Sequence, residues 1–218
     1  MKIRLEGATL GYGEAPVLSE VNFSQQRGER VVLLGPSGAG KSTLLMAIHA
    51  QLAGASRVAL VPQDGGLVPQ LSVRRNVYMG RLDDHGAARN LGALIYLRRP
   101  IRDEIDAILA RLGLQDHVRR PVEALSGGQR QRTAVGRAFY RGGDIIVADE
   151  PVSAVDGVQA RQIIEMIRDR FDTALLALHD VDLARAFATR IVGLRDGRIR
   201  FDGPAEAIDR RQIDALYA

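Results

Sequence analysis

The chain has 218 residues, of which 46% are hydrophobic and 26% charged, and this composition is ordinary for one globular domain, with or without an inserted subdomain. It has no cysteine, which excludes disulfides, thiolate metal sites and cysteine nucleophiles. The formal net charge of +4 is compatible with a nucleic-acid or anionic-membrane partner, and also with a surface that simply carries excess arginine.

The first residues do not favour a targeting or membrane segment. Residues 1–6 alternate between apolar and polar as a strand does, and they do not form a signal-peptide pattern. No apolar run approaches the roughly 18 residues that cross a membrane. We therefore expect any membrane role of this chain to depend on a partner.

The N-terminal part predicts strands around one helix. Residues 31–34 are a continuous apolar run, which is typical of a strand buried on both faces. Residues 3–5 alternate, and the short apolar run 58–61 ends at Pro62. Between these strands, residues 42–52 favour a helix that follows a glycine-rich loop.

Residues 65–141 change character and contain no convincing strand pattern. Asp103 is a candidate cap for a helix that ends near Leu112, and Ser126 is one for a second helix that ends near Arg141. This block therefore predicts a helical subdomain that is inserted into the rest of the chain.

The C-terminal part returns to alternating strands and helices. Residues 145–148 have the buried-strand pattern, and Asp196-Gly197 is a hairpin signal. Further elements are expected at 158–170, 173–178, 181–189, 191–194 and 198–201. The alternation predicts an α/β fold, with a largely parallel sheet covered by helices and antiparallel strands at the ends of the chain. The core would comprise residues 1–64 and 142–218.

The segment Gly35-Pro-Ser-Gly-Ala-Gly-Lys-Ser42 matches the phosphate-binding loop pattern, and it stands between a predicted strand and a predicted helix as that pattern requires. Glycines let backbone N–H groups approach phosphate oxygens, and the helix N-terminus adds a favourable dipole. Lys41 would reach the β- and γ-phosphates, and the Ser42 hydroxyl would bind Mg²⁺. The predicted nucleotide-binding residues of this loop are Gly35, Ser37, Gly38, Ala39, Gly40, Lys41, Ser42 and Thr43.

Two carboxylates, Asp149 and Glu150, directly follow the predicted strand 145–148. In an open α/β sheet the carboxyl end of a strand faces the same crevice as the phosphate loop. Asp149 would hold Mg²⁺ through water, and Glu150 would polarise an attacking water. The pair alone would as readily be an acidic cap before Pro151, and the phosphate loop favours the catalytic interpretation.

Gln63 and His179 each follow another predicted strand. The Gln63 amide oxygen could contact metal and water, and the His179 imidazole could donate to a γ-phosphate and sense its loss. Alone, each would be an ordinary loop glutamine or a structural histidine. Their positions beside the other predicted site residues favour the functional interpretation.

Leu125-Ser-Gly-Gly-Gln129 opens a predicted helix and forms a second anion-binding helix start. A nucleotide enzyme with one site needs no such second loop, although a plain helix cap would also fit it. A head-to-tail dimer explains the loop, because each ATP would then be closed by Ser126 and Gly128 of the opposite chain. The predicted nucleotide contacts here are Ser126, Gly127, Gly128 and Gln129.

These motifs, in this order, resemble those of the ATP-binding cassette (ABC) ATPases that power membrane transporters, and the resemblance covers nearly the whole chain. It matches the signature to 125–129 and the switch histidine to His179. Asp156 would belong to the family's aspartate loop, which crosses the dimer interface. Tyr12 matches the aromatic residue that stacks on adenine.

The resemblance implies a P-loop NTPase (RecA-like) core with an antiparallel β edge and the helical subdomain at 65–141. It implies ATP and Mg²⁺ as ligands, and a dimer of two copies or of paralogues that encloses two Mg-ATP. It also implies transmembrane permease subunits, a periplasmic or lipid-anchored substrate-binding protein, a place on the cytoplasmic face of the membrane, and no nucleic acid. A short permease helix would meet the surface after Gln63, whose apolar residues could equally be subdomain core: Leu67, Val68, Pro69 and Leu71.

The chain departs from the family pattern between Lys41 and Gln63, which are only 22 positions apart. The family usually has a longer stretch here with a further strand, so we expect a trimmed edge sheet.

Gly80-Arg81-Leu82 and the long insert that follows resemble the phosphonate or phosphite importer ATPases. An importer ATPase for another small solute, or an ABC-type ATPase of DNA repair or translation, remains an alternative.

Overall fold

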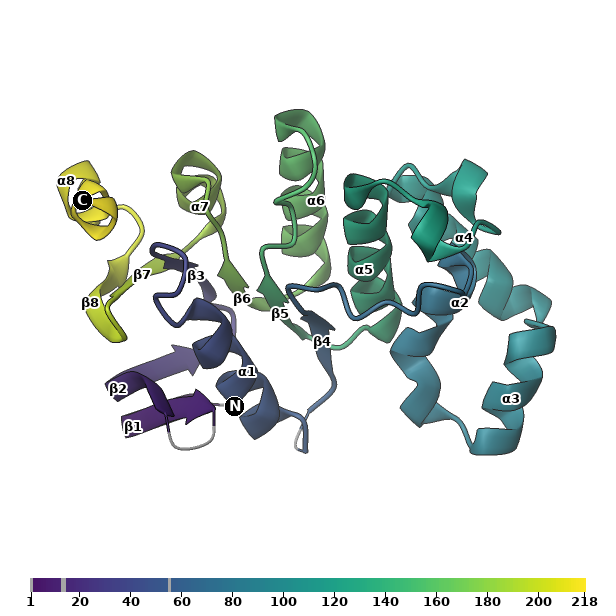
Figure 1. The fold of residues 1–218 in the computed structure, drawn as a ribbon, viewed down its shortest axis with the longest axis horizontal. Coiled ribbons are helices and arrows are strands. Elements are labelled where there is room, and N and C mark those ends of the chain that lie inside the picture. Colours follow the sequence, from purple (N-terminus) through teal and green to yellow (C-terminus); the bar gives the residue numbers. More distant parts are fainter. Residues whose placement is uncertain (1, 13–14, 55) are drawn as a thin grey trace.

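The computed structural model describes residues 2–12, 15–54 and 56–218 (Figure 1). Its main sheet has six strands in the order β4-β5-β6-β3-β7-β8, and only the last pair is antiparallel. The strands are β3 (Arg30–Leu34), β4 (Val58–Val61), β5 (Ile145–Asp149), β6 (Thr173–Ala177), β7 (Arg190–Arg195) and β8 (Arg198–Pro204). The parallel arrangement and the β7-β8 hairpin are those that the sequence predicts.

A second sheet consists of two long antiparallel strands, β1 (Lys2–Tyr12) and β2 (Ala15–Gln26). The sequence pattern predicts only residues 3–5 of it and misses β2, in which Leu18, Val21 and Phe23 are buried. No strand lies between α1 (Lys41–Leu52) and β4 in the described part of the chain, as the short spacing predicts. The antiparallel edge is thus present, in the expected trimmed form.

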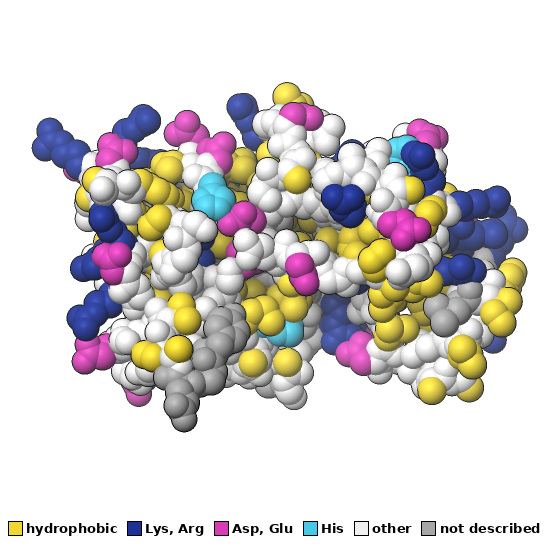
Figure 2. Space-filling view, in the orientation of Figure 1, with side chains coloured by type: hydrophobic (Ala, Val, Ile, Leu, Met, Phe, Trp, Pro, Cys, Tyr) yellow, Lys and Arg dark blue, Asp and Glu magenta, His cyan; other side chains and the backbone are white. Residues whose placement is uncertain are grey.

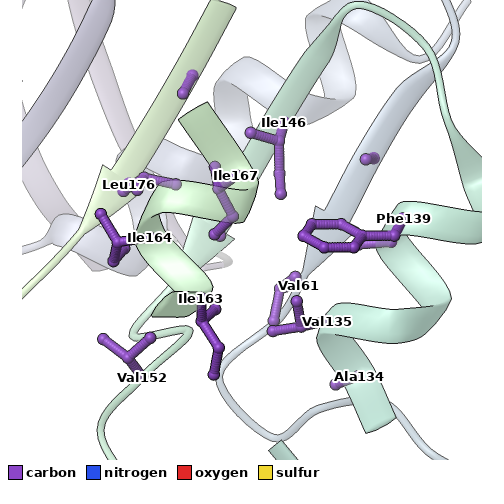
Figure 3. Packing of buried hydrophobic residues seen from close by; sticks show 14 of the residues in the cluster. Val61, Ala134, Val135, Phe139, Ile146, Val152, Ile163, Ile164, Ile167 and Leu176 are labelled. Atoms are coloured by element: carbon purple, nitrogen blue, oxygen red, sulfur yellow. The ribbon is translucent and has the colours of Figure 1, made fainter. Parts of the chain in front are cut away.

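Helices cover both faces of the main sheet. Successive residues of β3 show this, because Val31 and Leu33 pack with α1 and the β1-β2 sheet, whereas Val32 and Leu34 pack on the opposite side. That opposite layer contains α6 (Gly157–Arg170), α7 (Val181–Phe187) and α8 (Arg210–Tyr217). Figure 3 shows side chains of α5 (Gly127–Arg141) and α6 packing on the strands there. Burial on both faces explains the continuous apolar runs of these strands.

Residues 65–141 contain α2 (Val73–Tyr78), α3 (Ala87–Ile95), α4 (Arg99–Arg111) and α5 (Gly127–Arg141), with short 3₁₀ turns between them. α5 begins after its predicted cap, Ser126. α4 begins at Arg99 rather than after Asp103, because Pro100 occupies its first turn, where a proline costs no hydrogen bond. The sequence pattern did not predict α2, α3 or α8. The boundary of a separate subdomain stays a prediction.

The basic side chains are unevenly distributed over this fold. Figure 2 shows Lys and Arg side chains both at the end of the molecule that α2, α3 and α4 form and at the opposite end, near β8 and α8. Several large apolar side chains are exposed at the end that includes α3: Leu91, Ile95 and Tyr96. Among the described residues, no helix combines the length and the apolar character that a membrane span requires.

Candidate active site

The predicted site residues follow neighbouring strands and meet at one edge of the sheet. The strand order β4-β5-β6-β3 places Gln63, Asp149 with Glu150, His179 and the phosphate loop side by side in that sequence. Because these strands are parallel, all four segments leave from carboxyl ends. This edge is where open α/β sheets bind ligands.

The phosphate loop has a backbone that requires glycine. Gly35 and Gly40 have φ angles of 151° and 100°, in the left-handed half of conformational space. A Cβ at Gly35 would overlap the carbonyl oxygen of Leu194, and a Cβ at Gly40 would lie 2.5 Å from Leu18 Cδ2. The loop therefore keeps its shape only with glycine at these positions.

Lys41 begins α1 and is only 6% exposed. Its Nζ donates to the carbonyl oxygens of Gly35 at 2.7 Å and Pro36 at 2.9 Å, so the loop curls around its own ammonium group. Burial lowers the pKa of Lys41, and the nearby carboxylates of Glu150 and Asp149 act in the opposite direction. The charged lysine is thus held at the head of the loop by acceptors that a phosphate could replace.

Asp149 ends β5 and is 7% exposed. Burial raises the pKa of its carboxyl group, whereas a hydrogen bond with Ser42 lowers it. Within the described residues its Oδ1 atom has no hydrogen-bond partner. A buried carboxylate with a free oxygen beside a hydroxyl fits a divalent cation.

A site built on Asp149 and Ser42 would supply few protein ligands. No group of three or more His, Cys, Asp or Glu residues that could hold a metal occurs in the ranges that the structure describes. Such sparse coordination suits Mg²⁺, which is usually held by one or two carboxylates together with substrate phosphates and water.

Glu150 and His179 lie in contact. The Nε2 atom of His179 is 2.5 Å from Oε1 of Glu150, and the Glu150 side chain is 19% exposed. Glu150 has a φ angle of 51°, which is unusual for a residue other than glycine. Its N–H donates to the carbonyl oxygen of Ala177, so the start of this turn is tied to β6.

A cleft separates this edge of the sheet from the helices of residues 65–141. It has a volume of about 460 Å³, and its lining includes Gln63 and Glu150 on one side and Gly127 and Arg130 on the other. A second hollow of about 440 Å³ is lined by Ser42, Gln63 and Asp149, among others. The exposed side chain of Gln63 therefore stands between the two hollows.

The segment 125–129 forms the start of α5. Ser126 accepts a hydrogen bond from Gln129 N–H, and the Gln129 side chain accepts one from Ser126 N–H, which is a capping box. The Gln129 amide nitrogen also lies 2.8 Å from Nε2 of His117. No hydrogen bond among the described residues joins this segment to the phosphate loop of the same chain.

Asp156 and Tyr12 are the remaining predicted contacts. Asp156 caps α6 and accepts hydrogen bonds from the N–H groups of Val158 and Gln159. Tyr12 pairs with Ala15 at the end of β1, and its side chain lies outside the described part of the structure. The Asp156 side chain is thus engaged in a cap within its own chain.

Two polar residues that the sequence analysis missed bridge the site to α5. Arg137 donates to the carbonyl oxygens of Gly65 and Gly66, at 2.7 and 2.5 Å, and so anchors the segment after Gln63. Gln131 bonds the segment that follows β5. Nothing in their local sequence marks them, because both contacts depend on how α5 packs.

Comparison with known proteins decides the family. Residues 18–153 match the family described as ABC transporter, which is more than half of the chain. The chain belongs to this family. It is therefore an ATP-hydrolysing cassette.

Relatives of this ABC ATPase include phosphonate import proteins. It is 38% identical to a "Phosphonates import ATP-binding protein PhnC" of Frankia casuarinae, with 98% of this chain and 94% of the relative covered. A protein of the same name from Anaeromyxobacter dehalogenans is 35% identical over 99% of the chain. The chain spans 48% of that relative's length.

A solved structure has the same fold. The ATP-binding cassette MJ0796, solved as a dimer in a post-hydrolysis state with ADP and phosphate, matches with a TM-score of 0.81 at 26% identity. The match covers 95% of this ABC ATPase and 100% of the MJ0796 chain. The P-loop NTPase fold expected from the sequence is confirmed.

Proposed function

We propose that this ABC ATPase drives the import of phosphonate-type solutes through a membrane transporter. The observation that carries the proposal is the 38% identity to a phosphonates import ATP-binding protein over almost the whole length of both chains. Import of another small solute is the second candidate, because the ATPase subunit does not itself contact the cargo.

The proposed working unit is a head-to-tail dimer of two copies or of close paralogues. Ser126 and Gly127 are exposed at the start of α5, where their hydroxyl and N–H groups can meet an anion. In the dimer these groups, with Gly128 and Gln129, would close the nucleotide site of the opposite chain. Asp156 would lie near the same interface. The MJ0796 cassette, which was solved as a dimer, supports a dimeric working unit.

Hydrolysis would begin with rearrangement around Lys41. When ATP binds, the ammonium group would exchange the Gly35 and Pro36 carbonyls for β- and γ-phosphate oxygens. Ser42 and Asp149 would hold Mg²⁺, with Gln63 able to approach it from the cleft. The bound ion would neutralise phosphate charge. Tyr12 would stack on the adenine.

Glu150 is the proposed general base. Its carboxylate would accept a proton from the water that attacks the γ-phosphate, and Lys41 with Ser126 of the opposite chain would stabilise the charge that develops. His179 would leave its contact with Glu150 and donate to the γ-phosphate. Loss of that phosphate would let the contact form again.

Transmembrane permease subunits are the proposed partners, and they would hold the ATPase at the cytoplasmic face of the membrane together with a periplasmic or lipid-anchored substrate-binding protein. The docking surface would begin after Gln63, where Pro69 is exposed and Leu67, Val68 and Leu71 are half-buried. The buried amide of Asn76 exchanges hydrogen bonds with Val68 and fixes this segment. Such a rigid segment could transmit closure of the nucleotide site to a permease helix.

Uptake of a labelled solute tests the proposal. Cells that lack the chain should lose methylphosphonate uptake, and the native chain should restore it whereas Glu150→Gln should not. If loss of the chain leaves methylphosphonate uptake unchanged but abolishes uptake of a different solute, which the native chain then restores, the second candidate would be favoured. Normal uptake of every solute, together with an ATPase that stays in the DNA or ribosome fraction, would overturn the importer function.

A further inference from the structure

Gln131 on α5 uses its whole side-chain amide to hold the segment after β5. Its Nε2 donates to the carbonyl oxygen of Glu150 at 2.6 Å and to Ser153 Oγ at 2.9 Å, and its Oε1 accepts from Ala154 N–H at 2.8 Å. The orientation of the amide is determined by its partners, because the Glu150 carbonyl can only accept and the Ala154 N–H can only donate.

The residue that Gln131 holds has a strained backbone. Glu150 has a φ of 51° and precedes Pro151, although a residue before proline prefers an extended conformation. Such a conformation persists only when its surroundings hold it. The Glu150 N–H bonds to Ala177 on β6, and its carbonyl oxygen also accepts from Ser153 N–H within the turn. Gln131 adds the restraint that comes from α5.

The signature segment rests on the same turn. A Cβ at Gly128 would lie 2.7 Å from the carbonyl oxygen of Ala154, so the start of α5 and residues 153–155 are in close contact. Gln131 is five positions beyond Ser126, about 7.5 Å along the helix axis. The carbonyl of Glu150 and the signature segment are therefore joined by little more than one turn of one helix.

We propose that Gln131 is a positioning residue that aims the Glu150 carboxylate and makes it move together with the signature segment of its own chain. The inference rests on the proposed roles of Glu150 as base and of Ser126 in closing the opposite nucleotide site. Under those roles, Gln131 links the hydrolysis geometry of one site to the closure of the other. Gln131 itself does not contact the reacting atoms.

Two substitutions of Gln131 distinguish the hydrogen bonds that its amide donates from the one that it accepts. Gln131→Met keeps the length of the side chain and removes all three hydrogen bonds. Gln131→Glu keeps the acceptor for Ala154 N–H and removes both donors. The matched control is Gln162→Met on α6, because the Gln162 side chain is exposed and Gln162 is not among the predicted site residues.

Steady-state ATP hydrolysis is the first measurement. A displacement of the base of about 1 Å lowers rate by up to roughly 100-fold, so Gln131→Met should lower kcat by about 10- to 100-fold. Its KM for ATP should change by less than about threefold, because the phosphate-loop contacts are intact. Gln131→Glu should also lower kcat, since it loses the bond to Glu150, and Gln162→Met should change neither constant.

A double-mutant cycle with Glu150→Gln distinguishes positioning from a general structural role. If Gln131 acts through Glu150, Gln131→Met should slow single-turnover hydrolysis of Glu150→Gln by less than about threefold, since the base is already absent. Equal slowing in both backgrounds, or a native kcat in Gln131→Met, would overturn the inference. Should Gln131→Met fail to fold, Gln131→Glu carries the same cycle.

A failure of the proposed function can be distinguished from a failure of the inference about Gln131. Full turnover in Glu150→Gln alone would remove Glu150 as base whatever Gln131 does. An inactive Glu150→Gln beside a fully active Gln131→Met would leave the proposed function standing and overturn only the role of Gln131.

Discussion

Nε2 of His179 lies 2.5 Å from Oε1 of Glu150, across the ends of the neighbouring parallel strands β5 and β6. The histidine side chain is 47% exposed and the glutamate side chain 19%. The imidazole is therefore the more exposed member of the pair, whereas Glu150 lines the cleft. The two side chains thus hold one another at this edge of the sheet.

Glu150→Gln should separate ATP binding from hydrolysis. The amide keeps the size of the side chain but cannot accept the proton of an attacking water, so turnover should fall by at least about 100-fold. ATP binding should persist, and the dimer should accumulate, which size-exclusion chromatography with ATP would detect. Full turnover would contradict the assignment. Glu165→Gln on the exposed side of α6 is the control.

Ser126→Arg should weaken assembly more than nucleotide binding. An arginine at this exposed cap adds bulk and positive charge where an opposite chain would approach. ATP-driven dimerisation and hydrolysis should each fall at least about tenfold, while monomer affinity for ATP changes less than about twofold. Loss of the cap would also cost about 1 kcal/mol, so Ser126→Asn, which retains capping ability, is the matched control. Unchanged dimerisation would remove the signature segment from the interface.

Asp149→Asn should stabilise the nucleotide-free protein while abolishing Mg²⁺-dependent hydrolysis. Burial raises the pKa of Asp149 in the fold, so the folded chain holds its proton more tightly than the unfolded chain does. Stability from this group is present at low pH and lost as pH rises through the raised pKa. The Tm of Asp149→Asn should therefore exceed that of the native chain by more at pH 7 than at pH 4. For a chain of this size, each kcal/mol of stability corresponds to about 2–4 °C in Tm. A Tm loss at pH 7 would contradict this.

Tyr217→Phe should loosen the phosphate loop from the C-terminal helix. The Tyr217 hydroxyl accepts a hydrogen bond from Gly35 N–H at 3.2 Å, and burial raises the pKa of this hydroxyl. Because such a bond contributes about 0.5–1.5 kcal/mol, ATP affinity should weaken about two- to tenfold in nucleotide titrations. Tyr96→Phe, on an exposed tyrosine among the helices, is the control and should have no effect. Unchanged affinity in both variants would show that the contact is dispensable.

The sequence predicted the central strands well and the surrounding elements less well. Continuous apolar runs such as 31–34 and 145–148 are typical of strands that are buried on both faces of a sheet. β2 was missed because it mixes polar and apolar residues, and those of its residues that are buried, such as Leu18 and Val21, become so only in the folded protein, where β1 pairs with it. α3 was missed because it buries little apolar surface: Ala93 is buried, whereas Leu91 and Ile95 are exposed.

The candidate residues for the chemistry were predicted from the sequence itself. The phosphate loop, the Asp149-Glu150 pair and the signature segment are short motifs, whose function depends on the spacing of neighbouring residues and on the ends of single elements. Tertiary structure decided which other residues support them. Gln131 reaches Glu150 across 19 positions, Arg137 reaches Gly66 across 71, and Tyr217 reaches Gly35 across 182. Such contacts exist only after distant elements have packed together, so no local sequence pattern could have predicted them.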